Sequence, residues 1–273
     1  MQIQVPDILP LGSGFLLVHD IPSSRTLLDF LNEHCSSNNF DLDNVYNKYF
    51  EKIAQQQIRN CQPSHQSLRD VFKDIQKTYI PRNALKTQLQ LWYQDPTEYF
   101  VFRKQVALHL SVLNLSEFLF HLSSVLPEQL QFSMTSGAVT SFHFRFDINE
   151  STGELDANRP VPFRLTPALT EFLGVSVLGN ILPWMKLTAR ILQHADLYDW
   201  LQLFLWEEYF ALSNYSNAEP LSNKVSKAVT AITNRLQGLA NPDTGESTLS
   251  VLINAAQTLD NLCRMSPAFH PWF

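Results

Sequence analysis

The residues whose spacing comes closest to a metal site lie in the middle of the chain. Asp147, Asn149 and Ser151 alternate in the way that the first oxygen ligands of a calcium-binding loop do. Such a loop also needs glycine at its sixth position and a bidentate glutamate at its twelfth, and Thr152 and Asn158 stand there instead. The pattern therefore indicates an ordinary solvated loop, and neither a metal nor another cofactor is expected.

Other catalytic patterns fail in a similar way. The eight histidines form no HExxH or paired-ligand spacing, and no serine stands in a G-x-S-x-G turn. The glycine pair in 11–14 lacks the lysine and Ser/Thr of a phosphate-binding loop, so a plain turn is predicted there. Cys35, Cys61 and Cys263 are far apart and odd in number, which gives no disulfide framework and no CxxC metal signature.

Composition narrows the class of protein further. The 273 residues are 45% hydrophobic, 12% aromatic and only 17% charged, which favours a folded chain with large buried faces over a disordered one. The formal net charge of −6 argues against direct nucleic-acid binding, which needs a basic surface. No run of about 18 apolar residues occurs, so no membrane-spanning helix and no membrane partner are expected.

The elements that would position any site are predicted to be mostly helical. The first twenty residues read as extended structure punctuated by proline and glycine. After Ser23 and Ser24, interpreted as an N-cap, Leu27, Leu28 and Leu31 have helical spacing. Further helices are predicted at about 43–58, 64–77, 97–123, 166–173, 182–193, 197–212, 223–239 and 247–263. The helix at 97–123 is apolar nearly all round, which is typical of a helix in the middle of a domain.

One short β-hairpin interrupts this helical pattern. Residues 130–132 and 139–144 are β-type runs, and the turn signal Thr135–Ser136–Gly137 lies between them. Phe142, Phe144 and Phe146 alternate with polar residues, which predicts at least one buried face. The expected fold class is therefore α+β and predominantly helical.

Two blocks of sequence resemble a known superfamily. The segment 161–166, Val-Pro-Phe-Arg-Leu-Thr, is similar to the segment after the metal-binding loop of phosphatidylinositol 3-kinase-related kinases. Residues 260–273, from Asp-Asn-Leu-Cys-Arg-Met to Pro-Trp-Phe, look like the FATC element at the C-terminus of the same superfamily. With 64–70, 102–104 and 228–232 they most resemble the TRRAP family, the transcription-associated pseudokinases of histone acetyltransferase complexes.

The resemblance also indicates where kinase chemistry would be lost. Aligned on Ser136–Gly137, the catalytic-loop motif Asp-Arg-His-Pro-Ser-Asn falls on 124–129 and the Asp-Phe-Gly motif on 143–145. The catalytic aspartate position is then Ser124, the metal-binding asparagine Gln129 and the metal-binding aspartate His143. These side chains lack the carboxylate oxygens that orient a substrate hydroxyl and hold Mg²⁺, so no enzyme activity is expected. The alternative, an active protein or lipid kinase fragment of the superfamily, would need those aspartates.

The resemblance further implies a division of the chain and a role. Residues 1–20 would be a remnant of N-lobe strands and hinge, 21–239 a kinase-like C-lobe and 240–273 the FATC element, so the chain is expected to be part of a larger protein. The implied role is a non-catalytic scaffold in SAGA-type and related acetyltransferase complexes in the nucleus, with their other subunits and, through the rest of the protein, transcription activators as partners. Four terminal residues of anchor type are docking candidates, either onto the C-lobe, the favoured alternative, or onto another subunit: Phe269, Pro271, Trp272 and Phe273.

Overall fold

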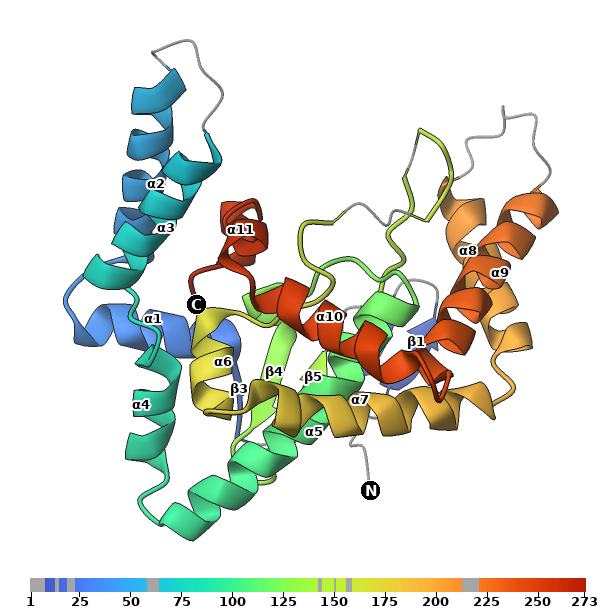
Figure 1. The fold of residues 1–273 in the computed structure, drawn as a ribbon, viewed down its shortest axis with the longest axis horizontal. Coiled ribbons are helices and arrows are strands. Elements are labelled where there is room, and N and C mark those ends of the chain that lie inside the picture. Colours follow the sequence, from blue (N-terminus) through green and yellow to red (C-terminus); the bar gives the residue numbers. More distant parts are fainter. Residues whose placement is uncertain are drawn as a thin grey trace.

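A computed structural model describes residues 8–12, 15–18, 23–57, 64–141, 144–149, 151–155, 159–212 and 221–273. Helices dominate these residues, and the strands form two small antiparallel sheets (Figure 1). The helices are α1 Leu27–Ser37, α2 Leu42–Gln57, α3 His65–Thr78, α4 Ala84–Trp92, α5 Pro96–Leu119, α6 Pro167–Leu173, α7 Val177–Gln193, α8 Tyr198–Leu212, α9 Leu221–Ala240, α10 Gly245–Gln257 and α11 Leu259–Leu262, with 3-10 turns η1 Pro127–Gln129 and η2 Pro267–Phe269. The strands are β1 Ile8–Gly12, β2 Phe15–Val18, β3 Ser24–Thr26, β4 Leu130–Ser133 and β5 Val139–Ser141.

Helix α5 lies at the centre of the body, as its all-round apolar pattern predicts. It contacts α6, α7, α9 and β5, and eleven of its residues are buried. Its start is fixed locally, because the Asp95 side chain accepts a hydrogen bond from the N–H of Thr97 and Pro96 needs no partner at the first position. The helix ends at Leu119, four residues before the predicted end, and His121 with φ 52° turns the chain away.

The predicted hairpin is present as β4 and β5, and β3 adds a third strand on the other side of β4. The predicted N-cap at Ser23 and Ser24 is wrong, since residues 24–26 pair with β4. Thr26 caps α1 instead: its side chain accepts from the N–H of Asp29, whose carboxylate accepts from the N–H of Thr26. Ser23, Ser24 and Thr26 are all residue types that favour the N-cap of a helix. Residues 24–26 pair with a strand about a hundred residues away, and this pairing makes Thr26 the N-cap of α1.

A glycine closes the β4–β5 turn in a conformation that other residues adopt at a cost. Gly137 has φ 72°, and an added Cβ would lie 2.9 Å from Cβ of Gln105 and 3.0 Å from the carbonyl oxygen of Phe102. Gly137→Ala is therefore expected to lower the free energy of unfolding by about 2 to 3 kcal/mol. Gly238→Ala, in α9 with open space around the new methyl, is expected to raise it by about 0.5 to 1 kcal/mol. Urea unfolding of both variants measures these two changes in the free energy of unfolding, which should have opposite signs. A Gly137→Ala variant as stable as the wild type would contradict the prediction.

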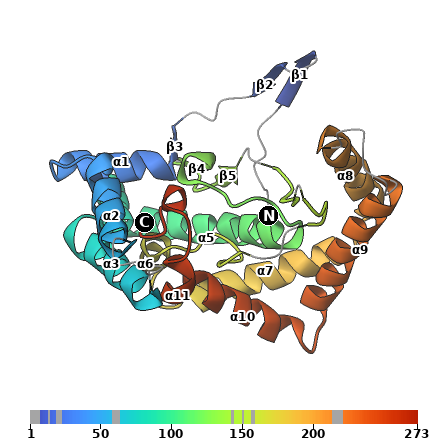
Figure 2. The same cartoon turned by 90° about the horizontal axis from the view of Figure 1, so that it is seen from above.

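The extended N-terminal stretch forms a hairpin of its own. Strands β1 and β2 pair with each other and stand away from the helical body (Figure 2). The two strands place four large apolar side chains in an exposed position: Leu9, Leu11, Phe15 and Leu17. The hairpin is thus a two-stranded ribbon in which these four side chains are not buried by the described residues.

The other described helices largely follow the predicted ones, with three differences. The predicted helix at 247–263 is broken at Thr258, whose extended backbone separates α10 from α11. Helix α7 begins five residues earlier than predicted and contains Pro183, because the Ser176 side chain accepts from the N–H of Gly179 and caps a start upstream of the proline. Helix α4 lies in a stretch where no helix was predicted.

Within the described ranges no single helix is long and apolar enough to cross a membrane. Only α6 and α7 taken together satisfy that test of length and composition, and a 91° bend separates them.

Candidate functional site

Two chain segments, residues 121–123 and 145–147, pair with each other beyond the end of α5. The N–H of Ser123 donates to the carbonyl of Arg145, and the N–H of Asp147 donates to the carbonyl of His121. An antiparallel bridge between Leu122 and Phe146 completes the pairing. The residues just before the predicted catalytic-loop positions therefore run side by side with those at the end of the predicted Asp-Phe-Gly positions and just after them.

Arg159 joins these segments to α5 through one guanidinium group. Its Nε donates to Oδ2 of Asp147 at 2.8 Å, and its Nη1 lies 3.3 Å from Oε1 of Glu117. The same Nη1 is 3.4 Å from Oγ of Ser124. The Arg159 side chain is 15% exposed and that of Glu117 only 3%, so most of this network is shielded from solvent. The hydroxyl of Ser124, the position predicted for the catalytic aspartate, thus faces an arginine that is already paired with two carboxylates.

The other two positions singled out from the sequence lie differently. Gln129 ends the turn η1, and its Oε1 accepts a hydrogen bond from the N–H of Leu126 at 2.8 Å. Its side chain therefore caps its own turn. His143 lies outside the described residues, as does Phe142. Of the remaining phenylalanines of that alternation, Phe146 is buried and Phe144 is 52% exposed.

Glu117 is the carboxylate most affected by this environment. Burial raises its pKa from 4.5 to about 7, against the opposing effect of Arg159, Arg164 and backbone N–H groups of Arg164 and Val125. Between these two pH values the folded protein holds a proton that the unfolded chain has released. This group therefore contributes stability below about pH 4.5, and that contribution is lost as the pH rises to about 7.

Glu117→Gln should remove this dependence. Relative to the variant, the wild-type free energy of unfolding is expected to fall by about 2 to 3 kcal/mol between pH 5 and pH 8, since each tenfold change in proton affinity is worth about 1.4 kcal/mol. The difference between two proteins must be measured, because burial lowers the pKa of His270 to about 4 and gives an opposite slope in both. Urea unfolding at four pH values tests this, with the exposed Glu128→Gln as the matched control. If the free energy of unfolding changed with pH in the same way in wild type and Glu117→Gln, Glu117 would not be the source of the pH dependence.

The segment 161–166 lies in the core. Val161, Phe163, Leu165 and Thr166 are each 1% exposed or less, and Arg164 between them is also 1% exposed. Arg164 donates from Nε to the carbonyl of Val125 at 2.8 Å and from Nη2 to the carbonyl of Phe269 at 2.5 Å. Its guanidinium carbon lies 3.8 Å from the centroid of the Phe269 ring. One buried arginine thus ties the predicted catalytic-loop region to the C-terminal residues.

The structure places the four docking candidates, Phe269, Pro271, Trp272 and Phe273, in buried positions within the chain itself. Trp272 lies against helix α2, with its ring centroid 5.8 Å from that of Tyr49 and 6.5 Å from that of Tyr46. The Tyr46 hydroxyl is 2.8 Å from Nε2 of His270. An ion pair between Arg69 of α3 and Asp260 of α11 also joins the C-terminal part of the chain to the helix that follows α2. The C-terminal end therefore packs against α2, α3 and the segment at Arg164.

Reasoning from the sequence assigned no role to Arg159, Tyr46 or Tyr49. The partners of Arg159 lie 12, 35 and 42 positions away, and Tyr46 lies 224 positions from His270. No local spacing rule reaches across such separations. The one available signal is that Arg159 stands two positions before the segment 161–166 that resembles the superfamily.

Comparison with known proteins identifies the fold and the relatives. No protein-family model matches the chain. The chain is 38% identical over 288 residues to the transformation/transcription domain-associated protein of Mus musculus, which covers 98% of this chain and 11% of that protein. It is 24% identical over its whole length to the SAGA complex/NuA4 acetyltransferase complex subunit Tra1 of Schizosaccharomyces pombe, of which it covers 8%.

The fold agrees with a structure of the FAT and kinase domain of CtTel1. The two align with a TM-score of 0.71 at 16% identity over 99% of this chain and 19% of that chain. This likeness confirms the mostly helical α+β fold of kinase type with a small hairpin. The chain spans about a tenth of the length of the curated relatives that it matches. The chain therefore belongs to the TRRAP/Tra1 family: it is homologous to these proteins over nearly its whole length and has the fold of the kinase region of Tel1.

Proposed function

We propose that this chain is the non-catalytic pseudokinase region of a large scaffold subunit of histone acetyltransferase complexes of the SAGA and NuA4 type. Two yeast relatives are named as subunits of the SAGA and NuA4 complexes. The scaffold supports activator-dependent transcription and chromatin modification from within the nucleus. It binds other subunits of the complex. It binds transcription activators through the rest of the full-length protein, and it makes no direct contact with nucleic acid or membrane.

The observation that carries the non-catalytic part of the proposal is the contact between Arg159 and Ser124. Phosphoryl transfer needs Mg²⁺ to neutralise the phosphates and a carboxylate to orient the attacking hydroxyl. By resemblance that carboxylate position is Ser124, and the guanidinium of Arg159 lies 3.4 Å from its Oγ. An arginine has no acceptor atoms, so it cannot replace the carboxylate that orients the attacking hydroxyl in an active enzyme.

The division of the chain into three parts belongs to the same proposal. The hairpin of β1 and β2, within residues 1–20, stands apart from the helical body, as strands of a separate lobe would (Figure 2). Residues 21–239 form the C-lobe around α5. Residues 240–273 form the FATC element, whose last residues are buried against α2 and α3 and so stabilise the C-lobe.

The test uses the full-length protein that contains this segment, purified from nuclei through an affinity tag. The purified material is expected to carry acetyltransferase activity on histones. Ser124→Ala should leave that activity unchanged, because it deletes only a long hydrogen bond, whereas Trp272→Ala should reduce it by destabilising the C-lobe.

Two results would contradict the proposal. If the purified protein carried no acetyltransferase activity, the proposed scaffold role would be contradicted. A loss of activity in Ser124→Ala at wild-type protein levels would mean that the hydroxyl at the catalytic position has a function of its own.

A further inference from the structure

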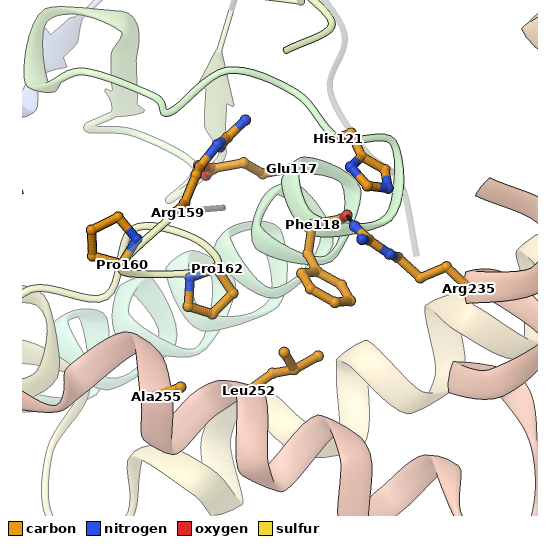
Figure 3. Close-up of a pocket in the computed structure, with 9 residues that line it drawn as sticks. All are labelled: Glu117, Phe118, His121, Arg159, Pro160, Pro162, Arg235, Leu252 and Ala255. Atoms are coloured by element: carbon orange, nitrogen blue, oxygen red, sulfur yellow. Dashed lines mark hydrogen bonds and ion pairs between the residues drawn. The ribbon is translucent and has the colours of Figure 1, made fainter. Parts of the chain in front are cut away.

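A cavity of about 250 Å³ lies between the end of α5, the segment 159–162 and helices α9 and α10 (Figure 3). Polar side chains line part of it, namely Glu117, His121, Arg159 and Arg235, and the remaining walls are apolar. They are formed by the Phe118 ring, two prolines and two side chains of α10: Pro160, Pro162, Leu252 and Ala255. The volume lies just below the ~300 to 1,000 Å³ of pockets that hold drug-sized ligands. The space therefore suits a molecule about the size of one substituted ring.

Arg235 of α9 supplies the charge at this cavity. Its guanidinium carbon lies 4.3 Å from the centroid of the Phe118 ring, and its Nη1 donates to the Phe118 carbonyl at 2.5 Å. Figure 3 shows the guanidinium reaching over Phe118 on the side of His121. Among the described residues no carboxylate lies within ion-pair distance of Arg235, although the side chain is only partly exposed.

The other arginine of the cavity differs from Arg235 in one respect. Arg159 is paired with Glu117 and Asp147, whereas Arg235 has no carboxylate partner among the described residues. Burial lowers the pKa of Arg235, and the nearby positive charge of Arg159 lowers it further. Partly buried cations of this kind are stabilised by an anion that brings a carboxylate or phosphate into contact with them.

We propose that this cavity binds a small organic anion, an aryl phosphate or aryl carboxylate, whose charged group pairs with Arg235 and whose ring lies between Phe118, Pro162 and Leu252. The planar guanidinium offers two parallel N–H donors to such a group. The proline and aromatic walls exclude water from the ring and strengthen that pair. This site is distinct from the contact between Arg159 and Ser124, and it does not depend on the proposed function.

The test titrates the full chain with phenyl phosphate and, separately, with benzoate at low salt. Saturation-transfer NMR and thermal unfolding are expected to show saturable binding of at least one probe, with the unfolding temperature rising with its concentration. Arg235→Met keeps the packing on Phe118 and should weaken that binding by about tenfold or more. Arg82→Met makes the same change of net charge at an exposed arginine beside a separate hollow and should leave binding unchanged.

A second variant leaves Arg235 in place. Ala255→Leu fills the cavity and is expected to abolish binding of the probe without lowering the unfolding temperature of the free protein. Inorganic phosphate should bind far more weakly than phenyl phosphate, because the apolar walls contribute only to the ring. The proposal is overturned if neither probe binds saturably, if Arg235→Met or Ala255→Leu binds like wild type, or if inorganic phosphate binds as tightly as phenyl phosphate.

Discussion

Replacing Trp272 by alanine is expected to lower the free energy of unfolding by about 3 to 5 kcal/mol. The side chain is 1% exposed, and its ring packs against Tyr46, Tyr49 and His270. Removal of the indole leaves a cavity between the last residues and α2. Trp272→Phe should cost only about 1 to 2 kcal/mol, because the indole N–H makes no hydrogen bond within the described part of the chain that phenylalanine would lose.

Urea unfolding followed by circular dichroism measures this series. Trp200→Ala is the matched control, since that indole is 60% exposed and its loss should change the free energy of unfolding by less than about 1 kcal/mol. Equal effects at Trp272 and Trp200 would mean that the C-terminal end does not stabilise the helices against which it packs.

Replacing Arg164 by methionine is expected to lower the free energy of unfolding by about 3 kcal/mol. Two buried carbonyl groups, those of Val125 and Phe269, lose their donors, and each unpaired group costs about 1 to 3 kcal/mol. The cation–π contact with Phe269 is lost as well. Nη1 of Arg164 is buried and has no hydrogen-bond partner among the described atoms. Its removal therefore offsets part of the expected loss in the free energy of unfolding.

Hydrogen exchange extends the test of Arg164 to the C-terminus. Amides at residues 269–273 should exchange faster in Arg164→Met, because the bond from Arg164 to the Phe269 carbonyl holds that segment. Arg164→Lys should destabilise about as much as methionine does, since one ammonium group lacks the planar fork that reaches both carbonyls. Arg264→Met, at an exposed arginine, should stay within about 1 kcal/mol of wild type. A stable Arg164→Met with unchanged exchange would contradict this role.

The helices and the hairpin were predictable because their signals are local. The apolar pattern around 97–119, the serine cap at Ser64 and the turn ending in Gly137 each act over a few residues. Helix α4 lacked such a signal, since Asn83 at its start makes no side-chain capping bond and the helix has only nine residues. Strand β3 depends on pairing with β4, which no local pattern encodes.

The candidate site was predictable only in part, for the same physical reason. The terminal aromatic residues were recognisable as anchors by type, yet their partners Tyr46 and Tyr49 lie in α2 at the other end of the sequence. Ser124 and Gln129 were identified from the resemblance alone. The arginine that faces Ser124 became visible only when the fold brought Glu117, Asp147 and Arg159 together.

The measurement that tests the central claim most directly is the stability of the chain with and without Mg-ATP. A pseudokinase whose metal-binding positions are replaced is expected to unfold at the same urea concentration in millimolar Mg-ATP as in its absence. An active kinase would bind the nucleotide only when folded and would gain about 2.7 kcal/mol at a hundredfold excess over the dissociation constant. A saturable stabilisation by Mg-ATP that Mg²⁺ alone does not produce would contradict the account.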